Sequence, residues 1–321
     1  MSIQQTQSRQ WKLLNPAQQP APRKAGSVVY AGSHGYSLLF GGGGKHDTWA
    51  WDGSTWKELK PKTVPPARLQ AVMTYDEQRQ TVVLFGGVDA HGMPLGDTWL
   101  WDGSNWQQAS STQSPQPRLG ASMTYDAGQK CVVLFGGEAL DGRVGALLND
   151  TWAWDGQSWQ QISTTGTPDA RRGACLTYDQ QYQQAVLFGG VSQTTILGDT
   201  WLLNGSQWIQ AAPIVNPPAR TWANLTYHAQ LQQSFLVAGV GDGPTSLHDT
   251  WTWDGANWQL TVSSAPFEGG YHSLAYDAKR QELLLYATTT ASKPILPGKQ
   301  QTNMQPLQTT KEPTSLTCVL S

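Results

Sequence analysis

Five arginines recur at one position of a repeating sequence pattern, each close behind a proline-containing stretch: Arg23, Arg68, Arg118, Arg171 and Arg220. A guanidinium group offers planar, bidentate recognition of a carboxylate or a phosphate. If the five side chains meet at one face of the fold, they form a site for an anionic ligand. The alternative is that each arginine is structural and holds carbonyl groups of the stretch before it.

The pattern breaks at one place. A sixth copy of the position falls on Gly269, and beside it stand Glu268, Tyr271 and His272, which the other copies lack. The position of Tyr271 holds, in copies two to five, Gln70, Gly120, Gly173 and Trp222. We therefore predict a ligand-binding site made of the five arginines together with Trp222, Glu268, Tyr271 and His272. The alternative is that the last copy has simply drifted.

The sequence predicts no catalytic residue, no metal ligand and no cofactor. The six histidines are scattered, and Cys131, Cys175 and Cys318 stand at unrelated positions without a metal-binding spacing. The glycine run 41–44 lacks the Lys-Ser/Thr pair and the helix of a phosphate-binding loop, so it is interpreted as a turn.

The elements that position the arginines follow from a second motif. Asp-Thr-Trp begins at Asp47, Asp97, Asp150, Asp199 and Asp249, at intervals of 50, 53, 49 and 50 residues, which indicates a repeat architecture. Each unit also has a short apolar run ending in small residues, usually Gly-Gly, and a Trp-bearing hairpin, usually with an Asp-Gly turn. These segments predict four short strands per unit and no helix, which is typical of a β-propeller. In such a meander, the arginine-bearing loop and the variable loop between strands two and three share one face.

The two ends of the chain complement each other. Trp11 precedes Tyr30 by 19 residues, the spacing that separates the fourth-strand Trp from the next Tyr in four later units. Residues 11–14 are therefore a fourth strand, whereas residues 276 and 283–286 belong to first and second strands without a following Asp-Thr-Trp. We predict a sixth blade composed from both termini, which closes the ring. Its third strand is residues 2–6, residues 315–320, or missing.

The glycine pair, the aromatic residue near the end of strand three and the Trp of strand four resemble kelch repeats, over roughly residues 8–290. WD repeats are shorter and carry a Gly-His pair, and the Asp-box of sialidases needs one more residue between Asp and Trp. The resemblance implies an all-β fold, a six-bladed kelch-type β-propeller of four-stranded antiparallel blades. We assign the propeller to residues 1–290, with repeats near 23–59, 68–109, 118–162, 171–211, 220–261, and 267–290 plus 8–14. We assign a flexible low-complexity tail to residues 291–321.

The resemblance also implies a function, because kelch propellers that bind acidic peptides use an arginine at the start of strand one. We expect a non-catalytic scaffold that binds a protein, an acidic peptide or a small anionic ligand at the arginine-bearing face. The alternative is a small-molecule or carbohydrate-acting enzyme with its site at the central mouth. It would be similar to the sialic-acid mutarotases or related to galactose oxidase, whose copper ligands cannot be matched here.

The composition restricts the expected partners and the expected cellular compartment. A formal net charge of −2 without a basic patch argues against nucleic acid and anionic membranes as partners. The chain shows no secretory signal and no apolar run near 18 residues, so we expect a cytoplasmic monomer with free thiols. The last four residues, 318–321, fit a C-a-a-X prenylation box, with coincidence as the alternative.

Overall fold

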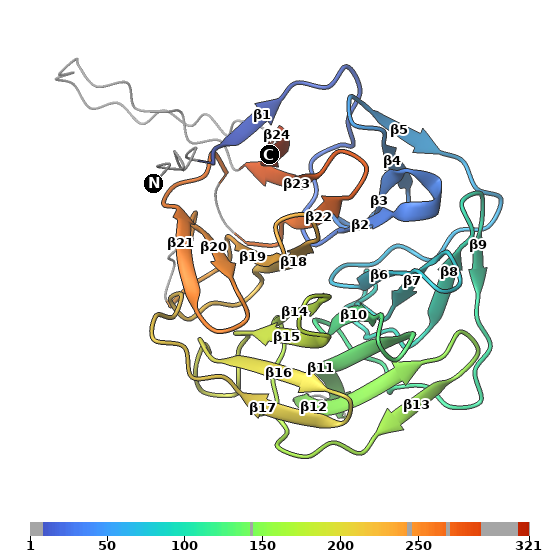
Figure 1. Ribbon diagram of the computed structural model, residues 1–321. Coiled ribbons are helices and arrows are strands. Elements are labelled where there is room, and N and C mark those ends of the chain that lie inside the picture. Colours follow the sequence, from blue (N-terminus) through green and yellow to red (C-terminus); the bar gives the residue numbers. More distant parts are fainter. Residues whose placement is uncertain (1–8, 142–143, 243–245, 268–269, 290–313, 321) are drawn as a thin grey trace, which may run out of the picture.

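Six four-stranded antiparallel sheets are arranged as a ring in the computed structural model (Figure 1). The structure describes residues 9–141, 144–242, 246–267, 270–289 and 314–320. One short 3₁₀ turn, η1 (Gly32–His34), is the only helical element within these ranges. The all-β, six-bladed propeller predicted from the repeat is therefore confirmed.

Blades one to five follow the chain, each from its innermost to its outermost strand. Blade one is β2 (Ser27–Ala31), β3 (Tyr36–Phe40), β4 (Thr48–Trp51) and β5 (Trp56–Leu59). Blade two is β6 (Val72–Asp76), β7 (Thr81–Phe85), β8 (Thr98–Trp101) and β9 (Trp106–Gln108). Blade three is β10 (Ser122–Asp126), β11 (Cys131–Asp141), β12 (Val144–Trp154) and β13 (Trp159–Ile162). Blade four is β14 (Cys175–Asp179), β15 (Gln184–Phe188), β16 (Thr200–Asn204) and β17 (Gln207–Gln210). Blade five is β18 (Asn224–His228), β19 (Gln233–Val237), β20 (Thr250–Trp253) and β21 (Trp258–Val262).

Blade six joins the two ends of the chain, as predicted. It consists of β22 (Ser273–Asp277), β23 (Glu282–Thr289), β24 (Thr314–Leu320) and β1 (Trp11–Leu14), and Trp11 pairs with Leu320. The third strand is therefore the C-terminal alternative. Residues 2–6, the other alternative, lie outside the described residues.

The expected tail needs a correction at its end. Residues 314–320 form β24, because Cys318 and Leu320 face the packing layer between blades five and six and are 0% and 2% exposed. Residues 290–313 lie outside the described residues. Because the thiol of Cys318 is buried, the folded chain does not present it as a prenylation site.

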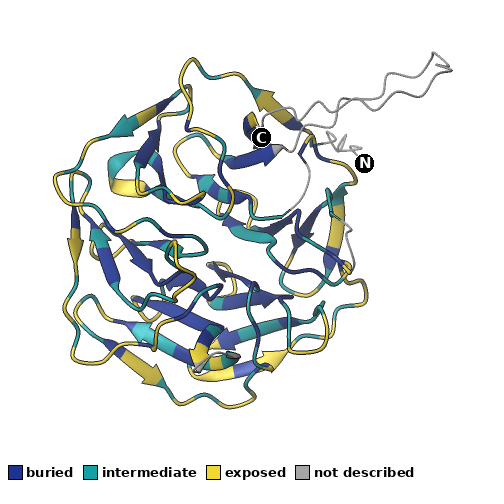
Figure 2. Ribbon diagram, turned by 180° about the vertical axis from the view of Figure 1, so that it is seen from behind, coloured by how far each residue is buried: buried dark blue, intermediate teal, exposed yellow. Residues whose placement is uncertain are grey.

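The hydrophobic core lies between neighbouring blades rather than in one central cluster. For example, Val83 and Phe85 of blade two pack with Val132, Leu134 and Trp159 of blade three. The second strand of each blade is consequently almost wholly buried, whereas each outermost strand has a buried tryptophan among exposed and half-buried residues (Figure 2). Most tryptophans of the repeat are buried in the core, as their fixed spacing predicted, and Trp152 and Trp201 are partly buried and pack against it.

One hydrogen bond ties each blade to the next. The indole N–H of the fourth-strand Trp donates to the Thr of Asp-Thr-Trp in the preceding blade, as Trp106 does to Thr48 at 3.0 Å. The other pairs are Trp159–Thr98, Trp208–Thr151, Trp258–Thr200, Trp11–Thr250 and Trp56–Thr317. Blade six has no Asp-Thr-Trp, and Thr317 of β24 occupies the equivalent place. This explains the threonine of the motif.

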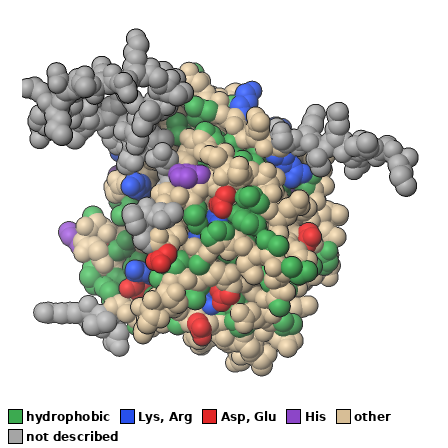
Figure 3. Space-filling model, turned by 90° about the vertical axis from the view of Figure 1, so that its left-hand side faces the viewer, with side chains coloured by type: hydrophobic (Ala, Val, Ile, Leu, Met, Phe, Trp, Pro, Cys, Tyr) green, Lys and Arg blue, Asp and Glu red, His purple; other side chains and the backbone are tan. Residues whose placement is uncertain are grey.

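The described residues contain no helix long and apolar enough to cross a membrane. On the side of the molecule that Figure 3 shows, acidic and basic side chains are interspersed and neither kind gathers into a patch.

Candidate functional site at the channel mouth

The loops expected on one face do lie together. In blades two to five, the residue directly after the repeated arginine pairs with the start of the variable loop in its own blade, as in the bridges Leu69–Val88, Leu119–Glu138 and Thr221–Val240. The starts of the six inner strands open at the same face. We call this opening the channel mouth.

The repeated arginines are buried, and four of the five N–H groups of each guanidinium are hydrogen-bonded, as Arg171 shows. The Nη1 and Nη2 atoms of Arg171 donate to the two carboxylate oxygens of Asp199 at 2.6 and 2.8 Å. Nη1 also donates to the carbonyl of Gly189, and Nε donates to the carbonyl of Asp169. The Arg171 side chain is 0% exposed. Its guanidinium therefore offers no surface to a ligand.

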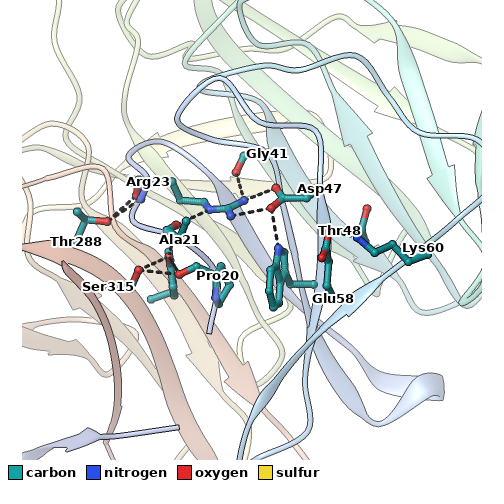
Figure 4. Close-up of polar contacts among 12 residues, drawn as sticks. Pro20, Ala21, Arg23, Gly41, Asp47, Thr48, Glu58, Lys60, Thr288 and Ser315 are labelled. Carbon is teal, nitrogen blue, oxygen red and sulfur yellow. Dashed lines mark hydrogen bonds and ion pairs between the residues drawn. The ribbon is translucent and has the colours of Figure 1, made fainter. Parts of the chain in front are cut away.

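The same arrangement repeats in blades one to five. The aspartate partners are the first residues of the five Asp-Thr-Trp motifs, and each also accepts the indole N–H of its own motif: Asp47, Asp97, Asp150, Asp199 and Asp249. Figure 4 shows the pair in blade one, where Arg23 Nε also donates to the carbonyl of Ala21 in the linker. Burial alone would raise the pKa of each aspartate, but hydrogen bonds and charge from the arginine outweigh it and hold the pKa below its ordinary range.

Blade six lacks both partners of the pair. The arginine position is Gly269, outside the described residues, and the aspartate position, one residue before Thr317, is Leu316. If the arginine bound a ligand, its loss would not be linked to the loss of a particular aspartate. If the two residues form a structural pair, they should be lost together. This geometry matches the structural alternative, in which the arginines hold linker carbonyls.

Shortly after the arginines in the chain, six residues that line the channel form a backbone ring around its mouth. They stand two residues after each arginine position and all have a left-handed backbone with φ between 55° and 66°: Ala25, Gln70, Gly120, Gly173, Trp222 and Tyr271. Five of them donate their N–H to the carbonyl of their counterpart in the preceding blade, at 2.8–3.3 Å: Ala25, Gln70, Gly120, Gly173 and Trp222. This conformation disfavours side chains, and it is uncommon for bulky residues.

The structure brings two of the predicted site residues together in this ring. The rings of Trp222 and Tyr271 stack with centroids 5.0 Å apart and planes 27° from parallel. A Cβ atom added to Gly120 would lie 2.8 Å from Cη2 of Trp222, and one added to Gly173 would lie 3.0 Å from Cδ2. The indole thus lies over the two glycines, so the small residues of blades three and four leave the space that Trp222 fills.

Of the remaining predicted site residues, one lies nearby and one lies outside the described residues. His272 is 8% exposed, packs edge-on against Phe267 at 5.4 Å and lines the channel below the stacked pair. Its counterparts in blades one to five are glycine or alanine. Glu268 lies outside the described residues. The upper channel encloses about 190 Å³ and is lined by the first residues of all six inner strands.

At the opposite mouth of the channel, all six blades have the same residue type at one position. The next-to-last residue of each inner strand is a tyrosine, and the hydroxyls of Tyr75 and Tyr178 accept hydrogen bonds from the N–H groups of Ser33 and Gly128 in the preceding blade. Since every copy is a tyrosine at this position, these side chains are best explained as ties between blades.

Blade three presents the longest described loop at the channel-mouth face. Strands β11 and β12 continue past the sheet as a hairpin, and Glu138 at its base forms an ion pair with the half-exposed Arg172. Variable loops on a rigid scaffold are where specificity is usually determined.

The described residues hold no group of three or more His, Cys, Asp or Glu side chains placed to bind a metal ion. Burial raises the pKa of Cys131 to about 11 and that of Cys175 and Cys318 to about 12, so the three thiols are not nucleophiles near neutral pH.

Comparison with known proteins agrees with this architecture. A family model described as the KLHDC2/KLHL20/DRC7 Kelch-repeats domain matches residues 49–239, which is more than half of the chain. No curated protein matches the chain.

Proposed function

Because the chain belongs to the kelch-repeat family of that model, we propose that it is a non-catalytic binding scaffold whose ligand face is the channel mouth. The ligand is a segment of a partner protein that contacts the stacked pair of Trp222 and Tyr271. A fold alone does not define a function, so the proposal depends on the geometry of this mouth.

The observation that carries it is a bulky aromatic pair in a backbone conformation that suits glycine. Gly120 and Gly173 occupy the same position of the ring and contribute to the same chain of N–H···O bonds. The fold therefore does not need side chains there. Strained residues that the scaffold does not require are a reason to infer function. Tyrosine and tryptophan are also the residues that contribute most energy at protein interfaces.

The proposal does not depend on the ring of arginines. An acidic ligand attracted by Arg23, Arg68 and the others would have to displace five aspartates from bidentate pairs. Breaking one such buried pair costs about 3–5 kcal/mol. We therefore infer that ligand contacts come from side chains of the backbone ring rather than from the arginines.

We also propose that the chain acts as a monomer, because β1 and β24 close the ring without a second chain. Sedimentation at micromolar concentration should give one species of the mass of a single chain. A concentration-dependent dimer would contradict this.

A selection experiment tests the binding site. Peptides selected from a random library on the wild-type protein are titrated into a Trp222→Gly/Tyr271→Gly variant and into a control, Ile209→Ala/Leu260→Ala. The control residues are about half exposed on the outer strands β17 and β21. The glycine variant should fold, since blades three and four carry glycine there. Selected peptides should lose at least about tenfold in affinity on it, as a hot-spot pair would predict, and none on the control. Unchanged affinity on the glycine variant would refute the proposal.

A further inference from the structure

The aromatic stack at the channel mouth is closed on one side only. Trp222 lies between the backbone of Gly120 and Gly173 on one side and the ring of Tyr271 on the other. Tyr271 also lines a groove on the side of blade one, and Trp222 does not. The stack therefore ends with a tyrosine ring that borders open space.

The groove beside Tyr271 is mainly apolar. It has a volume of about 490 Å³, and Pro22, Leu69 and Gly43 contribute to its walls. It is open because blade one has a short variable loop, with four residues between Gly42 and Asp47, against nine between Gly87 and Asp97 in blade two. An apolar groove next to an aromatic ring face is suited to another ring, because offset stacking adds to the burial of apolar surface.

Among the described residues that line the groove, one charged side chain has no ion-pair partner. Arg23 reaches its edge, but its guanidinium is paired with Asp47. Lys24 is exposed at the rim, and none of the described carboxylates pairs with it. A complementary ligand therefore has negative charge beside its ring.

We propose that this groove holds an aromatic side chain of a partner protein that is flanked by acidic residues. The ring stacks on Tyr271 between Pro22 and Leu69, and a neighbouring carboxylate meets Lys24. This inference rests on the proposed function, and it identifies the anchor that the channel mouth recognises.

Short peptides provide the test. The probes are Ac-Gly-Glu-Tyr-Glu-Gly-NH2, a second peptide with leucine in place of the tyrosine, and a third with lysines in place of both glutamates. Their binding to the full chain is followed by ¹⁵N NMR. The protein variants are Tyr271→Gly, Lys24→Glu and the control Lys62→Glu. The control makes the same charge change at an exposed lysine of the linker between blades one and two.

The first probe should bind with a dissociation constant of about 1 mM or tighter and should shift the amides of Ala25, Gln70 and residue 271. Loss of either ring, through the leucine probe or through Tyr271→Gly, should weaken binding by about tenfold, as stacking plus burial predicts. Lys24→Glu should weaken it by about two- to fivefold, as an exposed charge pair predicts. Lys62→Glu should leave it unchanged.

Several results would overturn the inference. These are no saturable binding of the first probe, equal affinity for the leucine or lysine probe, or an equal effect of Lys24→Glu and Lys62→Glu. The chain itself is the competing occupant, because residues 290–313 begin two residues after Thr288, which lines the groove. A variant with a Gly/Ser linker of equal length in place of 290–313 should bind like the wild type. Binding seen only in that variant would assign the groove to the chain.

Failure of this inference can be told apart from failure of the proposed function. Suppose that library-selected peptides bind the Trp222→Gly/Tyr271→Gly variant more weakly, contain no aromatic residue and bind Lys24→Glu as well as the wild type. This result would support the scaffold proposal and refute the aromatic anchor. Peptides whose affinity is unchanged on every channel-mouth variant would refute both proposals.

Discussion

Replacing Arg171 by alanine should destabilise the propeller strongly and leave ligand binding at the channel mouth intact. The neighbouring residue provides a matched control, because Arg172 also forms an ion pair but its side chain is 39% exposed, against 0% for Arg171. The two variants remove the same chemical group from adjacent positions. They differ in burial and in the number of hydrogen bonds lost.

The expected size follows from the contacts. Arg171→Ala leaves the partly buried carboxylate of Asp199 without its cation, and the carbonyls of Gly189 and Asp169 without their donor. Breaking a buried pair by removal of one partner costs about 3–5 kcal/mol. An exposed pair such as Arg172–Glu138 contributes at most about 1 kcal/mol. With an unfolding entropy of about 2.1 cal/mol/K per residue, the 321 residues give roughly 0.7 kcal/mol per kelvin. The melting temperature should therefore fall by about 4–7 °C for Arg171→Ala and by less than about 2 °C for Arg172→Ala.

Calorimetry at pH 7 measures the melting temperatures, and titration with a library-selected peptide measures binding. An Asp199→Asn variant adds a pH test. The pKa of Asp199 is lowered in the folded state, so its contribution to stability is fully present above the unfolded pKa and is lost as the pH falls through the folded pKa. The difference in stability between wild type and Asp199→Asn should therefore shrink below about pH 4. If Arg171→Ala melts like the wild type and loses the peptide, the structural assignment is wrong and the arginine ring is the binding site.

Three further predictions test closure, buried charge and metal content. Trp11→Ala should lower the free energy of unfolding by about 3–5 kcal/mol and Trp11→Phe, which loses the bond to Thr250, by only about 1 kcal/mol; wild-type melting of Trp11→Ala would contradict closure through β1. Asp179→Asn should raise the free energy of unfolding at pH 7 by about 1 kcal/mol. Burial raises the pKa of Asp179, and none of the described residues donates a hydrogen bond to its Oδ2. The charged carboxylate therefore lowers stability above the folded pKa. The matched control is Asp277→Asn, because Oδ2 of Asp277 accepts a hydrogen bond from Arg280. This substitution should lower stability, and equal changes in melting temperature for the two variants would contradict the prediction. Elemental analysis should find no stoichiometric metal, and chelation should leave the melting temperature unchanged; one equivalent of copper, zinc or iron would contradict the non-enzymatic proposal.

The fold was predictable because every element carries a repeated signal. The position of Trp11 relative to Tyr30 was enough to place β1 in the sixth blade, since a fixed phase along the chain corresponds to a fixed place in the blade. The strand β24 was the weak point. It lacks Asp-Thr-Trp, and its only clear link to the repeat is Thr317, whose partner Trp56 is 261 residues away.

The role of the arginines could not be settled from their own spacing. An arginine in every blade fits a ring of ligand contacts as well as a ring of structural ion pairs. The decisive signal was a correlation between two motifs, because blades one to five have both an arginine and an aspartate and blade six has Gly269 and Leu316. The distances between carboxylate and guanidinium favour the structural hypothesis, since a buried guanidinium that is paired with an aspartate offers no free face to a ligand.

Residues that repeat and residues that break the repeat carry different information in this propeller. The arginine–aspartate pairs recur in five blades, and the Trp–Thr bonds and the tyrosines of the opposite mouth recur in all six, so the fold accounts for them. At the ring position, two residues after each arginine, the fold needs only a left-handed backbone, which Gly120 and Gly173 provide without strain. Trp222 and Tyr271 adopt the same backbone at a cost of roughly 1–2 kcal/mol each, and the N–H of Trp222 makes the same hydrogen bond that a glycine would make. Since scaffold requirements do not explain that cost, the stacked pair is where a partner should be sought.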